Sequence, residues 1–282
     1  MPADVRLNVL PMTTFVAVTW MPTEKDVPFM SEQSITFGEK NKRRMTNELH
    51  TQVFNRDCIE LMRTLPDNYF HLAVADPPYG MAGVEDSEGA RFGARFAKYN
   101  VGQTDMNTWD AAPADDFFTE LFRVSEHQVI WGANFFPQMP ACKCFLCWVK
   151  TNIPDGFQMA QAEYAWTSLT CNARVFHYSS SRPRDNADHF HPTEKPTALY
   201  RWLYDVWLES TALKPTDGPL RVFDPMMGSQ SSRIAAHALG LDYTGCELDA
   251  EYFRRGCLRF EQETAGTITR PDGSQITQLS LF

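Results

Sequence analysis

Four residues with complementary chemistry, Asp76-Pro77-Pro78-Tyr79, directly follow the apolar run His71–Ala75, which is typical of a buried strand. Open α/β sheets bind ligands at the carboxyl ends of their strands, so this tetrapeptide is a candidate binding site. Proline has no N–H donor, which leaves a local carbonyl free to accept a hydrogen bond, and the aspartate is a second acceptor. The tyrosine ring offers a flat face for stacking. Together they could bind the exocyclic amino group of a base, although Asp-Pro-Pro also occurs as an ordinary strand-ending turn.

A second candidate site begins at Asp224, which ends the apolar run Val222-Phe223 and precedes a turn containing Gly228. Glycine allows close approach to the backbone, and a helix predicted to begin near Ser231 would present unpaired N–H groups to an anion. One glycine makes neither a phosphate loop nor a dinucleotide fingerprint, so the turn better suits a small carboxylate, such as that of a methionine moiety. Glu247 ends the next predicted strand, where an acid usually binds ribose hydroxyls. A plain strand-turn-helix with surface acids is the alternative.

Strands and helices alternate along the chain, which predicts an α/β fold with a mostly parallel sheet covered on both faces. We expect a main domain over 45–266, a poorly packed N-terminal extension over 1–44 and a C-terminal tail over 267–282. The extension is alternatively explained by a start site placed too far upstream. Predicted strands lie at 53–54, 71–75, 128–131, 145–149, 164–167, 220–223 and 243–246, and predicted helices at 59–65, 114–124, 199–208 and 231–239.

Composition narrows the class of protein. The 282 residues include 43% hydrophobic residues but no run long enough to span a membrane, and the N-terminus lacks a secretory pattern. Seven irregularly spaced cysteines indicate free thiols in a reducing cytoplasm, and Cys142, Cys144 and Cys147 do not have the spacing of a zinc site. We therefore expect a cytoplasmic protein without a bound metal. A net charge of −9 argues against nonspecific coating of nucleic acid, but not against local basic contacts.

The motifs, in their order along the chain, resemble the β-class amino-methylating DNA methyltransferases, and in particular compact phage- and prophage-type adenine enzymes. The resemblance covers about residues 50–262 and implies a Rossmann-like fold that uses S-adenosylmethionine, with the catalytic tetrapeptide preceding the cofactor turn in a permuted motif order. The segments that carry it are Asp57-Cys58, Asp76–Gly80, Val129–Asn134, Ala162–Thr167, His191–Pro196, Asp224–Ser232 and Gly245–Asp249.

The resemblance implies a role for each matching residue. Asp76 and the Pro77 carbonyl would hold the target amino group, and Tyr79 would stack on the flipped base. Glu247 would bind the ribose of the cofactor, while Asp57, Cys58 and Leu248 would flank its adenine. The methionine end would lie among Asp224, Gly228, Ser229 and Ser231, with Lys195 as a further polar contact. Small target-recognition insertions would lie near 80–110 and 167–190, with Arg91, Arg95, Lys98, Arg182 and Arg184 as candidate contacts to double-stranded DNA.

The implied reaction is methyl transfer from S-adenosylmethionine to adenine N6 in a base flipped out of the duplex. Aspartate rather than serine before Pro-Pro-Tyr favours adenine by family tendency. The alternatives are an N4-cytosine enzyme, a catalytically inactive DNA- or clamp-binding relative, and methylation of RNA or of a protein amide.

The tail residues Gln278, Leu279, Leu281 and Phe282 resemble a peptide motif that binds the bacterial sliding clamp, unless the tail folds back or is disordered. The sequence leaves the target site, a partner restriction enzyme and a homodimer open.

Overall fold

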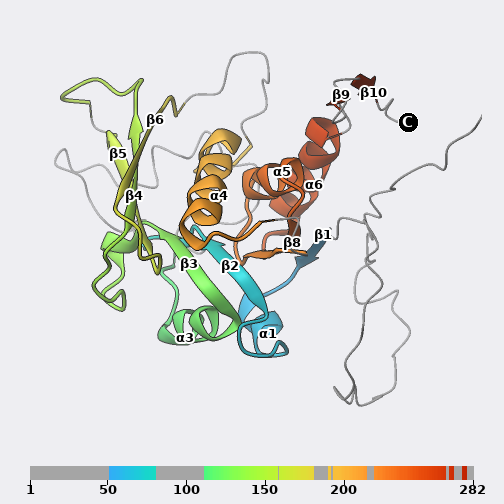
Figure 1. Cartoon of the computed structure of the whole chain (residues 1–282), viewed down its shortest axis with the longest axis horizontal. Coiled ribbons are helices and arrows are strands. Elements are labelled where there is room, and N and C mark those ends of the chain that lie inside the picture. The colour runs from blue at the N-terminus through green and yellow to red at the C-terminus, as the bar shows by residue number, and fades with distance from the viewer. Residues whose placement is uncertain are drawn as a thin grey trace, which may run out of the picture.

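An eight-stranded sheet runs through the molecule, and helices cover both of its faces (Figure 1). The computed structural model describes residues 51–80, 111–157, 159–180, 190–191, 193–214 and 219–264, and the backbone of 267–269 and 275–277. The sheet consists of β1 (Thr51–Asn55), β2 (Phe70–Ala75), β3 (Ser125–Trp131), β4 (Phe145–Lys150), β5 (Ala162–Thr167), β6 (Arg174–Tyr178), β7 (Arg221–Asp224) and β8 (Asp242–Glu247). The helices are α1 (Cys58–Met62), α3 (Asp115–Val124), the short 3₁₀ helix η3 (Ala133–Phe135), α4 (Thr197–Thr211), α5 (Ser231–Ala238) and α6 (Ala250–Thr264).

The strands follow the order β1-β8-β7-β2-β3-β5-β4-β6, and the predicted mostly parallel sheet is confirmed. Only β5 is reversed, since it pairs antiparallel with both β3 and β4. A separate antiparallel pair is formed by β9 (Thr267–Thr269) and β10 (Gln275–Thr277).

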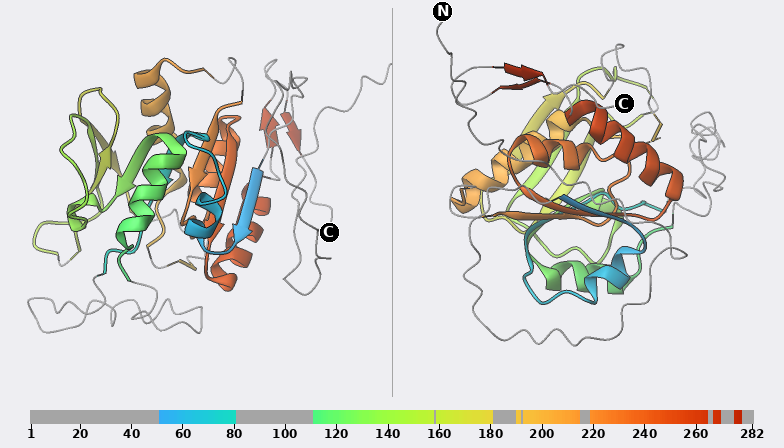
Figure 2. Two further views of the ribbon diagram at one scale, coloured as in Figure 1. Left: turned by 90° about the horizontal axis from the view of Figure 1, so that it is seen from below. Right: turned by 90° about the vertical axis from the view of Figure 1, so that its right-hand side faces the viewer.

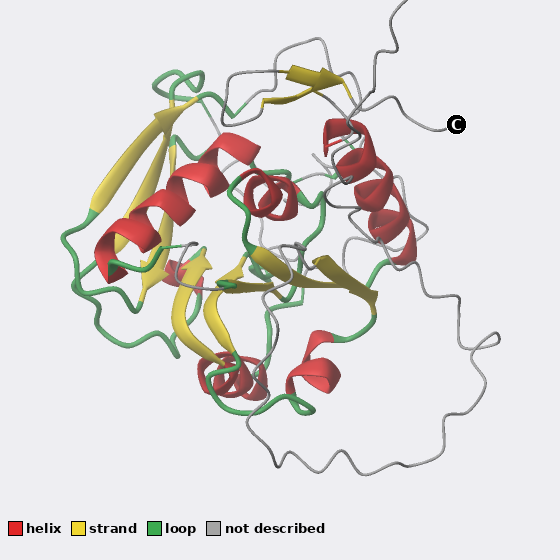
Figure 3. Cartoon of the chain, turned by 45° about the vertical axis from the view of Figure 1, so that its right-hand side comes forward, coloured by secondary structure: helices red, strands yellow, loops and turns green. Residues whose placement is uncertain are grey.

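The two faces of the sheet carry separate apolar clusters, as the alternation of side chains along a strand requires. In β2, Leu72 and Val74 pack in the cluster that contains residues of α4 and α5, whereas Ala73 and Ala75 pack in the cluster that contains residues of α1 and α3. Figures 2 and 3 show these two helix groups on opposite sides of the sheet. This double burial explains why β2 reads as a continuous apolar run.

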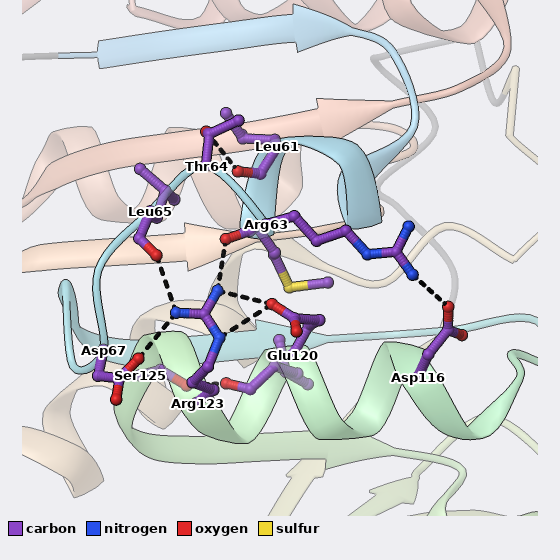
Figure 4. Close-up of polar contacts among 11 residues, drawn as sticks. Leu61, Arg63, Thr64, Leu65, Asp67, Asp116, Glu120, Arg123 and Ser125 are labelled. Atoms are coloured by element: carbon purple, nitrogen blue, oxygen red, sulfur yellow. Dashed lines mark hydrogen bonds and ion pairs between the residues drawn. The ribbon is translucent and has the colours of Figure 1, made fainter. Parts of the chain in front are cut away.

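Arg123, in the last turn of α3, ties that helix to the chain between α1 and β2 (Figure 4). Its guanidinium donates to the backbone carbonyls of Met62, at 2.7 Å, and Leu65, at 2.8 Å. It also contacts the carboxylates of Asp67, at 2.9 Å, and Glu120, at 2.6 Å. The side chain thus binds backbone carbonyls at the end of α1 and in the turn that follows it.

Five of the described elements were not predicted from the sequence: the short helix η3, the pair β9 and β10, strand β6 and helix α6. Strand β6 lies within the range 167–190 assigned to an irregular insertion, and it extends the sheet by pairing with β4. Helix α6 follows Glu247 closely and packs against α5 and β8. The predicted N-terminal extension, residues 81–110 of the long loop, residues 181–189 and the last five residues lie outside the described residues. Within the described part of the chain, no helix combines the length and hydropathy needed to cross a membrane.

Candidate active site

The sheet brings the two predicted motifs to one edge. Strands β2 and β7 are parallel neighbours, with Leu72 opposite Val222 and Ala73 opposite Phe223. Asp76, directly after β2, and Asp224, at the end of β7, therefore lie at the same edge, and Glu247 ends the adjacent strand β8. From β7 the chain continues to β8 on one side, and from β2 to β3 on the other. Open α/β sheets bind ligands at such a reversal of strand order.

Asp76 is held by two side chains. One carboxylate oxygen forms an ion pair with the Lys195 ammonium, and the other accepts a hydrogen bond from the Tyr79 hydroxyl at 2.9 Å. Burial raises the pKa of Asp76 above its ordinary value, and the charge of Lys195 partly offsets this effect. Lys195 precedes α4 and is only 4% exposed.

Lys195 also contacts a second carboxylate. Its ammonium lies 3.2 Å from Oε2 of Glu163, in β5, and Oε1 of the same side chain pairs with Lys150, in β4, at 2.6 Å. Burial disfavours the charged form of Lys195, but the carboxylates of Asp76 and Glu163 hold its pKa above the ordinary value. The ammonium groups of Lys195 and Lys150 likewise outweigh burial and hold the pKa of Glu163 below its usual range. The ion pairs of this array therefore favour the charged forms of Lys195 and Glu163, whereas burial disfavours the charged form of Asp76.

Tyr79, the last residue of the tetrapeptide, packs against the segment that follows β3. Its ring stacks on Phe135, with 5.0 Å between centroids and 17° between planes, and Phe135 remains 42% exposed. Gly132 has φ +65°, and a Cβ there would lie 2.1 Å from Tyr79 Cε1. Only glycine leaves room for the tyrosine ring at this position.

The turn after β7 is built around Gly228 and Glu247. The Gly228 N–H donates to Oε2 of Glu247 at 2.8 Å, and the Asp249 N–H donates to Oε1 at 2.9 Å. Burial raises the pKa of Glu247 to about 7. Gly228 has φ +45°, and a Cβ there would lie 2.9 Å from Nε2 of His191, so the turn and the 191–196 segment approach each other closely.

Asp224 itself is buried and serves the turn. It accepts hydrogen bonds from Ser232 Oγ at 2.5 Å and from the Met226 N–H at 3.1 Å, and burial raises its pKa to about 7. Arg259, from α6, reaches the same turn and donates to the Ser229 carbonyl and to Ser231 Oγ, each at 2.9 Å. These bonds fix the backbone of the turn.

The residues expected beside the cofactor's adenine have mixed environments. Asp57 is the N-cap of α1 and accepts from the backbone N–H groups of Ile59, at 2.7 Å, and Glu60, at 3.1 Å. Cys58 is buried, and burial raises the pKa of its thiol to about 12, while Leu248 is 72% exposed.

Several residues were missed, or named only within a resembling segment. Glu163 and Gly132 belong to segments that carry the resemblance, but neither had an assigned role, and Phe135 and Arg259 had no signal at all. The candidate DNA contacts Arg91, Arg95, Lys98, Arg182 and Arg184 and the four tail residues lie outside the described residues. Among the residues that are described, no group of three or more His, Cys, Asp or Glu side chains is placed to bind a metal ion.

No family model matches the chain. A search of curated proteins finds the type II methyltransferase M.HinfI of Haemophilus influenzae, 23% identical, with 83% of this chain and 73% of that protein covered. It also finds the putative methylase YubD of Escherichia coli K12, 24% identical, with 72% and 87% covered. The chain is similar to DNA methyltransferases. The predicted resemblance is thus confirmed at this level.

The chain also aligns with several solved structures. They include the M1.HpyAVI–SAM complex, with 19% identity, a TM-score of 0.43, and coverage of 74% of this chain and 99% of that one. The PvuII cytosine-N4-specific DNA methyltransferase has 13% identity, a TM-score of 0.48, and coverage of 76% and 90%. A putative DNA modification methylase from Thermus thermophilus, complexed with S-adenosyl-L-methionine, has 17% identity, a TM-score of 0.45, and coverage of 77% and 96%.

Proposed function

We propose that this protein is a DNA methyltransferase that transfers the methyl group of S-adenosylmethionine to N6 of adenine. The observation that carries the proposal is the meeting of two strand ends: Asp76, from the tetrapeptide, and Asp224, from the glycine turn, follow neighbouring parallel strands. Asp76 precedes Pro-Pro-Tyr, and the resemblance associates that aspartate with adenine. The similarity to M.HinfI and YubD supports the reaction class.

The residues at the ends of β7 and β8 fit S-adenosylmethionine. Glu247 is half-buried at a strand end, and its oxygens accept the backbone N–H groups of Gly228 and Asp249. An ionised carboxylate has about four lone-pair sites, so it can also accept hydrogen bonds from ribose hydroxyls. Gly228 keeps the turn free of a side chain, and Arg259 holds Ser229 and Ser231 in place. The bound cofactor would supply an activated methyl group on a positively charged sulfur.

The acceptor side of the reaction belongs to Asp76. An ionised carboxylate has about four lone-pair sites, so Asp76 can accept from the target amino group while it contacts Lys195 and Tyr79. Hydrogen bonds from the amino protons raise the nucleophilicity of the nitrogen and stabilise the positive charge that develops on it. Burial raises the pKa of Asp76, which makes this carboxylate a better acceptor for the proton that the nitrogen must lose. The buried thiol of Cys58 takes no part, because its raised pKa keeps it protonated.

Asp76→Ala tests the proposal directly. Loss of the carboxylate removes an acceptor from the transition state, and we expect kcat to fall by roughly 10²–10³-fold. The affinity for S-adenosylmethionine, measured by calorimetric titration, is expected to change less than threefold. Asp76 belongs to the tetrapeptide and not to the Gly228 turn, which is the part proposed to bind the cofactor. Near-normal methylation by this variant would contradict the assignment.

The target base is identified by mass spectrometry of nucleosides from DNA treated with the wild-type protein. We expect N6-methyl-2′-deoxyadenosine. N4-methylcytosine would instead support the cytosine alternative, for which the same acceptors are suitable. An absence of methylation on DNA of all sequences, together with intact cofactor binding, would favour an inactive DNA-binding relative.

A further inference from the structure

We propose that Glu163 is a positioning residue for methyl transfer, because it shares the Lys195 ammonium with Asp76 and takes more of it when the target amino group binds. This inference rests on the proposed function and names a further residue of the same site. Glu163 lies in β5, which is far in sequence from both predicted motifs.

The contacts show how the ammonium is shared. Lys195 is buried and pairs with Asp76 Oδ2 on one side and with Glu163 Oε2, at 3.2 Å, on the other. Lys150 pairs with the other Glu163 oxygen at 2.6 Å, so it fixes the orientation of the carboxylate and aims Oε2 at Lys195. The ammonium can therefore move between two carboxylates without becoming unpaired.

Such sharing solves a conflict at Asp76. If the buried Lys195 ammonium had only Asp76 as a partner, it would compete with the target amino group for the same carboxylate. If the ammonium then moved away from Asp76, it would become an unpaired buried charge, which is costly. A second carboxylate removes this penalty. Glu163 thus keeps Lys195 close enough to maintain Asp76 as an anion, yet allows Asp76 to turn its lone pairs toward the base.

Several other groups contribute to the field at this array. Tyr200, from α4, interacts electrostatically with Asp76, Asp224 and Lys195, and burial raises its pKa well above the ordinary value, so it stays neutral. His191 lies within the field of Lys195, and burial lowers its pKa to about 4, so it is neutral as well. Asp224, from β7, interacts with Asp76 and is bound by Ser232. Lys195 and Glu163 are therefore the charges whose removal changes Asp76 most directly.

The test compares Glu163→Gln, Lys195→Met and the double variant by measuring the pH dependence of kcat in the full-length protein. In Glu163→Gln, the ammonium has only Asp76 as its acidic partner and one negative charge is lost. The acid limb of the pH profile, where kcat falls as Asp76 becomes protonated, is therefore expected to move to lower pH. The plateau kcat at higher pH is expected to fall about tenfold or more. In Lys195→Met, the effect of burial on Asp76 is unopposed, and the acid limb is expected to move to higher pH.

The double variant tests whether Glu163 acts through Lys195. Adding Glu163→Gln to Lys195→Met is expected to change the plateau kcat less than threefold, because the shared group is already absent. Glu163→Asp, which keeps the charge, is expected to retain more plateau activity than Glu163→Gln. The inference is overturned if Glu163→Gln keeps a wild-type plateau kcat, or if the acid limbs of the two single variants move in the same direction. It is also overturned if Glu163→Gln lowers kcat equally with and without Lys195, or if Glu163→Asp loses as much kcat as Glu163→Gln.

Glu120→Gln is a matched control. Glu120 is 18% exposed, compared with 22% for Glu163, and pairs with Arg123 (Figure 4). It lies on α3, which leads into the amino end of β3, so it is distant from the carboxyl ends of the strands. We expect lower stability and an unchanged acid limb. Titration with S-adenosylmethionine checks that each variant binds cofactor. A wild-type protein that methylates no DNA would refute the proposed function, whereas an active wild type with the wrong variant pattern would refute only the role of Glu163.

Discussion

At the scale of single residues, the candidate site is dominated by carboxylates that are partly or fully buried. Asp76, Asp224 and Glu247 all lie at the ends of neighbouring strands, and burial raises the pKa of each. Their partners differ. Asp76 has a buried cation, whereas Glu247 has backbone N–H groups and Asp224 a backbone N–H group and a hydroxyl. The cation beside Asp76 favours its ionised form. The backbone N–H groups around Glu247 leave its pKa at about 7, so this side chain changes its protonation state near neutral pH.

The raised pKa of Glu247 predicts pH-dependent cofactor binding. With a pKa of about 7, Glu247 is mostly protonated at pH 6 and mostly ionised at pH 8. The ionised form is the stronger acceptor at both oxygens, so the affinity for S-adenosylmethionine is expected to rise by roughly five- to tenfold over this interval. Calorimetric titration at the two pH values measures the change. Glu247→Gln is expected to bind weakly and almost independently of pH, and an unchanged pH dependence in that variant would assign the titration to another group.

The sequence predicted the acids of the site but not their supporting residues. Asp76 and Asp224 could be recognised because each ends an apolar strand at a proline, and Glu247 because it ends the next strand. Glu163 could not be recognised in this way, because it stands near the beginning of its strand. Since β5 runs antiparallel to β3, the start of β5 meets the carboxyl ends of the other strands. Glu163 therefore lies at the site because of the direction of β5, and the apolar pattern of a sequence does not predict strand direction.

At the scale of elements, long apolar patterns were predicted well and polar ones were not. The strands before Asp76 and Asp224 and the helix α3 were found within a few residues of their observed bounds. Strand β6 escaped prediction because it is an edge strand with mostly exposed residues, and its order depends on pairing with β4. Helix α6 is polar on average, so its buried side, which includes Tyr252, Gly256 and Phe260, gave only a weak period.

Arg123→Met tests whether α3 is fastened to the α1–β2 connection. The change removes hydrogen bonds to the carbonyls of Met62 and Leu65, and we expect the free energy of unfolding to fall by about 2 kcal/mol. Urea unfolding measures this loss. Arg63→Met is the control, because Arg63 and Asp116 form an exposed ion pair, with 58% and 49% of the side chains accessible (Figure 4). That variant is expected to lose less than about 0.5 kcal/mol. Equal losses in the two variants would contradict the fastening role of Arg123.

At the scale of the whole molecule, the strand order places the two motifs together although about 150 residues separate Asp76 from Asp224 in the sequence. The alternation of strands and helices predicted a mostly parallel sheet, but it did not specify which strands are neighbours. The pairing of β2 with β7 depends on the long-range packing of two apolar clusters on either side of the sheet.

The same arrangement predicts unequal local stability across the sheet. Strand β2 has a neighbour on each side and is buried on both faces, whereas β6 pairs only with β4 and is largely exposed. Backbone amides of β2 are therefore expected to exchange with solvent at least 10²-fold more slowly than those of β6. Hydrogen exchange followed by mass spectrometry measures the difference. Similar protection of both strands would mean that the described sheet opens as one cooperative unit.

The contact between Tyr79 and Phe135 has a consequence for affinity. A planar ligand that stacks on the covered side of the tyrosine ring must first displace the phenylalanine, so one aromatic pair is exchanged for another. Pairs of this kind contribute about 0.5–1.5 kcal/mol, and the exchange therefore yields a small net gain. Because this gain is small, discrimination between an extrahelical base and other flat molecules must come mainly from hydrogen bonds to the polar atoms at the edge of the base. The half-exposed Phe135 ring thus covers one face of Tyr79 and helps to fix the orientation of that ring.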